Sequence, residues 1–110
     1  MIVTEVREME EQMLGFEVRL FLLGSRGYTV KILRAIPKVC IIREPRFLSR
    51  LREAQFCEFE LCGCIFKVWE PLWDRDYTRR SLWVRHIITT DKSAICKEYL
   101  ELIRHRFIAT

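Results

Sequence analysis

Five cysteines and two histidines are the side chains of this sequence best suited to nucleophilic or metal chemistry. Three of the cysteines are close together in the chain, at Cys57, Cys62 and Cys64. Structural zinc sites usually take four ligands from two paired elements, with two to four residues between the cysteines of a pair. Only Gly63 separates Cys62 from Cys64, and no fourth ligand is near in sequence. The cluster therefore predicts no metal site.

A cysteine nucleophile needs a histidine within reach and an open, electropositive setting. Cys64 and His86 could meet across neighbouring strands, which would give a thiol-dependent enzyme. The alternative, which we favour, is a buried thiol and a hydrogen-bonded histidine. Because glutamates stand where an export signal would place positive charge, we expect a cytoplasmic protein with five free thiols. No apolar run near the N-terminus is long enough to span a membrane.

Three carboxylates, Glu70, Asp74 and Asp76, lie within seven residues and could hold a hard cation. A carboxylate-dependent enzyme is therefore a further alternative. Arginines alternate with these acids and compensate their charge, so a solvated and internally paired loop is the favoured interpretation. The sequence contains no P-loop, dinucleotide-binding, zinc-protease or serine-hydrolase motif, so we predict no cofactor.

The same segment is rich in tryptophan, tyrosine and arginine, the side chains that dominate protein interfaces. A second group of arginines falls in a predicted helix near residue 48. These patterns predict a partner-binding surface, although the same composition would stack on single-stranded nucleic acid. The predicted contact residues are Trp69, Trp73, Arg75, Tyr77, Arg79, Arg80, Arg46 and Arg50.

The charge is unevenly distributed along the chain. Residues 1–15 hold one basic and four acidic side chains, a net charge of −3. Residues 19–52 hold nine basic side chains and one acidic one, a net charge of +8. Most of these bases are arginine, which suits bidentate contact with carboxylate or phosphate. An acidic partner, either a protein or a nucleic acid, is therefore expected.

Residues 66–85 carry a resemblance to known proteins. A strand ending in Glu70-Pro71, an acidic loop and an aromatic-rich strand follow one another there. This order resembles small bacterial immunity proteins of toxin systems, which often have glycine and asparagine in the loop where this chain has Trp73 and Arg75. The resemblance implies a protein that binds and blocks a partner rather than one that catalyses a reaction.

The elements that must position these residues can be predicted from hydrophobic periodicity. Residues 3–14 favour a short helix with Gly15 as its C-cap, and a strand starting at Ile2 is the competing interpretation. Residues 16–23 and 28–36 then read as a strand pair around a turn, and residues 38–43 as a short buried strand.

In the second half, Pro45 opens a predicted helix that runs to about residue 54. A hairpin of residues 56–61 and 64–69 follows, and a polar loop leads to a last strand over residues 81–88. Thr90 or Asp91 is expected to cap the final helix. Its predicted apolar stripe is Ile95, Tyr99, Leu102, Ile103 and Phe107.

Hairpins outnumber strand–helix–strand units in this order, which predicts a single α+β domain over residues 1–110. We expect a mostly antiparallel sheet of about five or six strands with two or three helices packed on one face. The predicted function is a small, non-enzymatic protein-binding module, an inhibitor or immunity-type partner of another protein. A basic nucleic-acid-binding protein is the alternative, and a thiol- or carboxylate-dependent enzyme is the second alternative.

Overall fold

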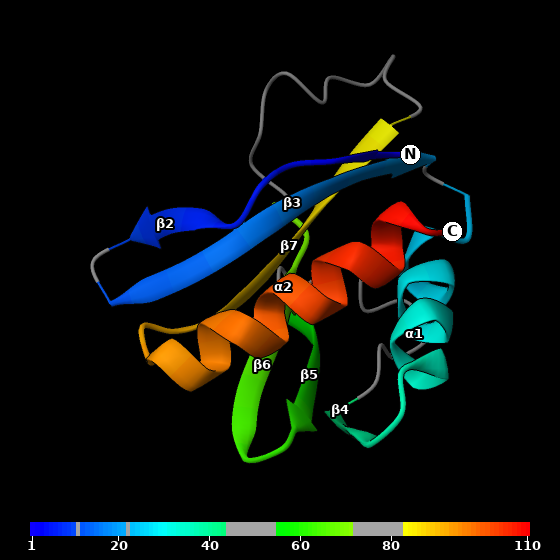
Figure 1. Cartoon of the computed structure of the whole chain (residues 1–110). Helices are drawn as coiled ribbons and strands as arrows, with labels where there is room; N and C mark the ends of the chain where they lie inside the picture. The colour runs from blue at the N-terminus through cyan, green and yellow to red at the C-terminus, as the bar shows by residue number, and fades with distance from the viewer. Residues whose placement is uncertain (11, 22, 44–54, 72–82) are drawn as a thin grey trace.

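A seven-stranded antiparallel sheet with two helices packed on it makes up the described part of the chain in the computed structural model (Figure 1). The structure describes residues 1–10, 12–21, 23–43, 55–71 and 83–110. The predicted α+β class, with an antiparallel sheet and helices on it, is confirmed. The elements are β1 (Ile2–Val3), β2 (Arg7–Glu10), β3 (Met13–Phe21), α1 (Ser25–Ala35), β4 (Val39–Arg43), β5 (Gln55–Leu61), β6 (Cys64–Trp69), β7 (Trp83–Asp91) and α2 (Ala94–Ile108).

The two longest strands, β3 and β7, pair at the middle of the sheet. The strand order is β1-β3-β7-β6-β5-β4, and β2 pairs with β3 beside β1. Nine residue pairs join β3 to β7, from Met13↔Asp91 to Phe21↔Trp83. Helix α1 carries the chain from β3 to β4 at the far edge, and α2 returns it across the sheet (Figure 1).

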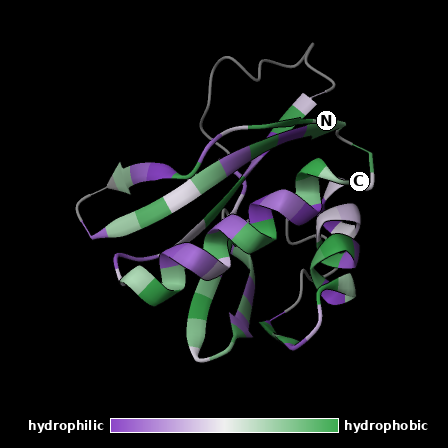
Figure 2. Ribbon diagram, viewed as in Figure 1, coloured by the Kyte–Doolittle hydropathy of each residue, from purple (hydrophilic) through white to green (hydrophobic). Residues whose placement is uncertain are grey.

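The hydrophobic core lies between the sheet and the two helices. Side chains alternate between the faces of a strand, and hydrophilic and hydrophobic bands alternate along β3 and α2 (Figure 2). Phe16 packs edge-to-face on Phe107 of α2, with the ring centroids 5.9 Å apart. Phe59 and Phe66 stack on each other at 5.0 Å across β5 and β6. All four rings are fully buried.

Helix α1 corrects the predicted strand over residues 28–36. Tyr28, Val30 and Ile32 are strong strand formers that alternate, and this local preference misled the prediction. The buried positions instead follow a helical repeat: Ser25, Arg26, Thr29, Val30, Ile32 and Leu33. Burial of this stripe against the sheet outweighs the intrinsic preference of the residues for a strand.

The predicted helix over residues 3–14 is wrong, and the competing strand interpretation describes this region. Arg7 pairs with Gly15 in a hairpin that turns near Gln12, whose φ is 88°. Gly15 is therefore not a helix C-cap. A Cβ atom on Gly15 would lie 2.7 Å from the carbonyl oxygen of Ile88 and 3.1 Å from Met9 Cγ. Glycine is required there by close packing within the sheet.

The C-terminal elements were predicted more accurately. Strand β6 has the predicted bounds and β4 and β5 nearly so, although β4 is an edge strand with half-buried and exposed side chains rather than a buried strand. Strand β7 is described from Trp83 and runs to Asp91, three residues beyond the predicted end. Ser93, rather than Thr90 or Asp91, caps α2 by accepting a hydrogen bond from the Cys96 N–H at 3.0 Å. The predicted helix over 45–54 lies outside the described residues.

The buried side of α2 differs from the predicted stripe. Cys96, Leu100, Ile103 and Phe107 are buried, whereas Ile95 and Leu102 are exposed. Cys96 takes the place assigned to Ile95 because it forms a disulfide with Cys64, with the Cα atoms 5.7 Å apart. The prediction of five free thiols is therefore also wrong. Cys40, Cys57 and Cys62 are free.

Candidate partner-binding face

The sheet has a second face, turned away from the two helices. On β3, Phe16, Val18 and Leu20 are buried toward the helices, so the residues between them point the other way. Side chains of three strands, β3, β7 and β6, come together there through the pairings Glu17↔Ile87, Arg19↔Arg85, Phe21↔Trp83 and Trp69↔Ile87. Arg7 of a fourth strand, β2, lies beside them. We define the outer face as Arg7, Glu17, Arg19, Phe21, Trp69, Trp83, Arg85 and Ile87.

Three arginines surround one buried carboxylate on the outer face. Arg7 Nη2 lies 3.6 Å from Glu17 Oε2, while the Nε atoms of Arg19 and Arg85 lie 3.6 and 3.5 Å from Glu17 Oε1. Glu17 is only 5% exposed, whereas Arg7 and Arg19 extend into solvent. Arg7 and Arg19 present positive charge to solvent around this one carboxylate, which suits an acidic partner.

An aromatic pair continues the outer face toward the end of β3. Phe21 and Trp83 meet edge-to-face with their centroids 6.2 Å apart, yet each keeps about half of its surface exposed, 45% and 50%. A cavity of about 380 Å³ opens beside them and is also lined by Leu23 and Tyr28. Exposed aromatic and aliphatic groups next to arginines have the composition of a protein interface.

Trp69 is the only predicted contact residue that lies in the described part of the chain. It is half-buried on the outer face, and its indole N–H donates to Thr89 Oγ1 at 3.0 Å. Its polar group is thus used within the sheet, and its ring supplies apolar surface. The other predicted contacts lie in 44–54 and 72–82, outside the described residues: Trp73, Arg75, Tyr77, Arg79, Arg80, Arg46 and Arg50.

Sequence reasoning missed most of the outer face. Phe21, Arg19 and Glu17 were assigned to a strand, but their neighbours across β7 could not be read from periodicity. The signal that was present is the alternation of β3, which puts Glu17, Arg19 and Phe21 opposite its buried residues. Trp83 and Arg85 alternate in the same way on β7.

A buried polar network lies on the opposite, helix-covered side of the sheet. Glu70 Oε2 accepts from Arg26 Nη2 at 3.0 Å, and Glu70 Oε1 lies 2.9 Å from His86 Nε2. His86 Nδ1 is 2.7 Å from Thr29 Oγ1. The Arg26 guanidinium also stacks over the Phe56 ring, 4.7 Å from its centroid. This network ties the first turns of α1 to β6 and β7.

The protonation states in the network follow from its contacts. Burial alone would raise the pKa of Glu70, but hydrogen bonds from His86 and Arg26 outweigh it, so the pKa is lowered. Burial lowers the pKa of His86 despite its hydrogen bond to Glu70. At neutral pH an ionised Glu70 therefore accepts from the Nε2–H of a neutral His86, whose Nδ1 accepts from the Thr29 hydroxyl.

A hydroxyl, an imidazole and a carboxylate in a chain are the parts of a catalytic triad. Thr29 and His86 are both fully buried, however, so their side chains are closed off from solvent. Both oxygens of Glu70 are engaged, so this carboxylate is not placed to hold a cation. We therefore assign the network to structure. Glu70 and His86, the two residues that the enzyme alternatives required, thus have their polar groups bonded inside the fold.

The proposed Cys64–His86 pair does not form. Cys64 is bonded to Cys96 and pairs with Leu61 at the hairpin turn, whereas the strand register places His86 beyond Trp69 at the other end of β6. Burial raises the pKa of Cys57 to about 11, which leaves that thiol unreactive. Asp74 and Asp76 lie outside the described residues. Among the residues that the structure describes, no group of three His, Cys, Asp or Glu side chains could hold a metal ion.

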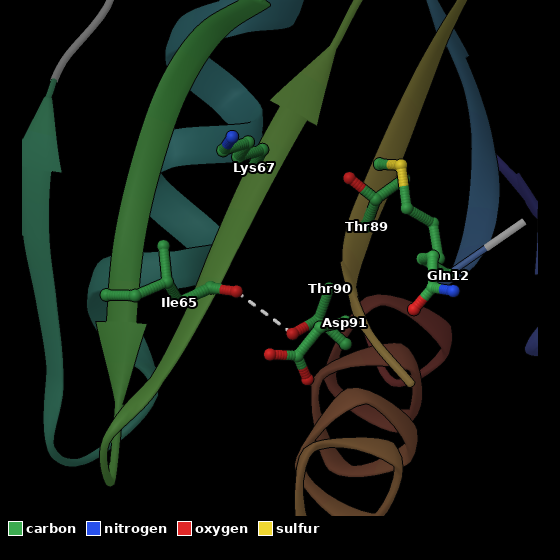
Figure 3. Close-up of a pocket in the computed structure, with 7 residues that line it drawn as sticks. Gln12, Ile65, Lys67, Thr89, Thr90 and Asp91 are labelled. Atoms are coloured by element: carbon green, nitrogen blue, oxygen red, sulfur yellow. Dashed lines mark hydrogen bonds between the residues drawn. The ribbon is translucent and has the colours of Figure 1, made fainter. Parts of the chain in front are cut away.

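A second cavity of about 290 Å³ opens where β6 and β7 separate (Figure 3). Backbone pairing of these strands begins at Lys67↔Thr89, and nearer the hairpin turn the Thr90 hydroxyl donates to the Ile65 carbonyl at 2.9 Å. Lys67 and Asp91 give the lining one charge of each sign. This cavity shows no cluster of like charges that would select a charged substrate.

A scan against protein-family models found no match, and searches of curated proteins and of solved structures found none either. No helix in the described ranges is long and apolar enough to cross a membrane.

Proposed function

We propose that this chain is a small, non-enzymatic protein-binding module, an inhibitor or immunity-type partner that engages an acidic protein through the outer face. The observation that carries the proposal is the combination of the Arg7, Arg19 and Arg85 cluster with the exposed Phe21–Trp83 pair on one sheet face. Arginine supplies directed charge and the aromatic rings supply contact area, which is how binding hot spots are built.

The cationic cluster supports an acidic partner, and its geometry supports selectivity. Because Glu17 lies within 3.6 Å of all three guanidiniums, it favours arginine positions close together on one face, which reduces the side-chain entropy lost on association. We place the protein in the cytoplasm, where disulfides that do form are mostly reversible.

The experiment compares two double variants as baits in a pull-down from cells that naturally make the protein. Arg19→Gln with Trp83→Ala removes charge and aromatic area from the outer face. Ile95→Ala with Lys97→Gln removes one exposed apolar group and one positive charge from the exposed side of α2. The proposal expects a protein partner recovered with the wild type and with the α2 variant, and lost with the outer-face variant. Equal recovery by all three baits would refute the assignment of the outer face.

Nucleic-acid binding is the second candidate, because arginines beside exposed aromatic rings also suit phosphates and stacked bases. A single-stranded oligonucleotide is the probe that separates the two. Binding that weakens steeply with salt and is lost in the outer-face variant would favour this candidate, because phosphate contacts release counterions. A recovered protein partner whose binding survives nuclease treatment supports the protein-binding proposal.

A further inference from the structure

Three cysteines meet where the β5–β6 hairpin touches α2. Cys62 and Gly63 form a two-residue turn closed by the Leu61↔Cys64 pair, with φ angles of 51° and 86°. Both angles are left-handed, as in the tight turns that suit the twist of a hairpin. Cys64, the first residue after the turn, is bonded to Cys96 of α2, and Cys62 is a free thiol.

Tyr99 places the free thiol on the side of the sheet that carries the disulfide. Tyr99 of α2 lies beside Cys62, and its contact with that thiol raises the pKa of Tyr99. Tyr99 follows Cys96 by three residues, so the two side chains are neighbours on the surface of α2. The thiol of Cys62 is thus held next to the helical turn that carries Cys96.

Access from solvent differs sharply between the three sulfur-bearing residues. Cys64 and Cys96 are 5% and 6% exposed, whereas Cys62 is exposed at the hairpin turn. Exchange requires in-line attack of a thiolate on a disulfide sulfur, which depends on access. A small thiol from solvent therefore meets Cys62 before it can reach the Cys64–Cys96 bond.

The position of Cys96 in α2 favours its departure as the leaving group. Ser93 is the N-cap, and its side chain binds the Cys96 N–H, so Cys96 lies in the first turn of a 15-residue helix. The unpaired N–H groups and the positive end of the helix dipole stabilise an anion there. A sulfur that carries negative charge more readily leaves faster in thiol–disulfide exchange.

We propose that Cys62, Cys64 and Cys96 form a thiol–disulfide exchange site for small thiols and disulfides of the glutathione class. In the first step the Cys62 thiolate attacks Cys64 Sγ, the Cys62–Cys64 bond forms, and the Cys64–Cys96 bond breaks. The electron pair leaves with Cys96, which takes up the proton that Cys62 has lost. An external thiolate then attacks the exposed Cys62 Sγ and releases the Cys64 thiolate. A second external thiol resolves the mixed disulfide, so two thiols are oxidised and one disulfide is reduced.

The first test compares Cys62→Ser with Cys40→Ser, which removes another exposed free thiol, on the edge strand β4. Each protein is incubated with reduced glutathione, quenched with an alkylating reagent and mapped by mass spectrometry. The proposal expects reduction of Cys64–Cys96 to slow several-fold in Cys62→Ser and to remain at the wild-type rate in Cys40→Ser. Equal rates in both variants would overturn it. So would a wild-type protein that forms no Cys64–Cys96 bond after equilibration with glutathione disulfide.

The second test detects the exchanged state directly. In Cys96→Ser, glutathione disulfide should generate a Cys62–Cys64 bond, seen as a peptide that has lost two hydrogens and resists alkylation. Cys64→Ser is the matched control, and in it Cys62 should remain a mixed disulfide with glutathione. If Cys62 bonds to Cys96 in the control while Cys62 and Cys64 stay unlinked in Cys96→Ser, the proposed step is wrong.

Discussion

Arg19 and Arg85 lie directly opposite each other on β3 and β7, an arrangement of like charges that normally weakens a sheet. Glu17 makes the arrangement tolerable, because Glu17 Oε1 lies within 3.6 Å of the Nε atom of each. The carboxylate thus holds together a cationic surface that would otherwise repel itself.

Glu17→Gln should therefore destabilise the fold although it preserves the shape of the side chain. We expect a loss of about 1–2 kcal/mol in the free energy of unfolding, since three guanidiniums lose their shared counter-charge. The loss should shrink at high salt because salt screens the repulsion between Arg19 and Arg85. Urea denaturation at two salt concentrations measures both effects, and Arg19→Gln added to Glu17→Gln should recover part of the loss. A loss unaffected by salt would indicate a packing defect instead.

Glu70 and Arg26 form the buried ion pair of the network, and each is less than a tenth exposed. Removing one partner leaves the other charge buried, which typically costs about 3–5 kcal/mol. Glu70→Gln should thus lower the midpoint of thermal unfolding markedly. Glu101→Gln breaks the Glu101–Arg104 contact on the surface of α2 and is the matched control, with an expected cost within about 1 kcal/mol. Similar losses in the two variants would contradict the structural role of the network.

The same network sets a pH dependence of stability. The pKa of His86 is lowered in the folded state from its ordinary 6.5, so its contribution is complete above pH 6.5 and is lost as the pH falls. The pKa of Glu70 is lowered from 4.5, so its contribution disappears only at still lower pH. The free energy of unfolding should therefore decline in two stages on acidification, the first beginning near pH 6.5.

The two histidines of the chain provide the control for this pH profile. His86→Gln should be less stable at pH 7 and should lose the decline that begins near pH 6.5. His105 is exposed near the end of α2, and His105→Gln is the matched control for removing a histidine. The free energy of unfolding, measured from denaturation curves between pH 7 and pH 5, distinguishes the two variants. A flat wild-type profile over that range would show that His86 does not titrate as its burial requires.

The C-terminal half of the fold could be predicted because local pattern and tertiary environment agree there. Phe59, Leu61, Phe66 and Val68 alternate with polar residues in sequence and face the core in the structure. The Cys62-Gly63 turn is a strong local signal, and the strands it joins were predicted almost residue for residue. A segment is readily predicted from sequence when its local preferences agree with its tertiary environment.

The N-terminal half could not be predicted in the same way because local and tertiary preferences conflict. Val30 and Ile32 favour a strand locally, yet their burial with Thr29 and Leu33 completes a helical face. On the outer face Glu17 pairs with Ile87, 70 positions away, and in the buried network Thr29 meets His86, 57 positions away; periodicity does not encode such contacts. Cysteine pairing is likewise not readable from spacing, so Cys64–Cys96, separated by 32 residues, was missed.

Gly15 and Gly27 give the most direct test of how the N-terminal half folds. A methyl group at Gly15 would meet the Ile88 carbonyl oxygen at 2.7 Å, within the central β3–β7 pairing, where backbone cannot move cheaply. Gly15→Ala should therefore cost about 1–3 kcal/mol through overpacking. A methyl group at Gly27 meets nothing within 4 Å, and Gly27 lies in α1, so Gly27→Ala should stabilise by about 0.5 kcal/mol. Urea denaturation should show a lower free energy of unfolding for Gly15→Ala and a higher one for Gly27→Ala. If Gly27→Ala destabilised as Gly15→Ala does, residues 25–35 would not be helical, and the predicted strand would have to be restored.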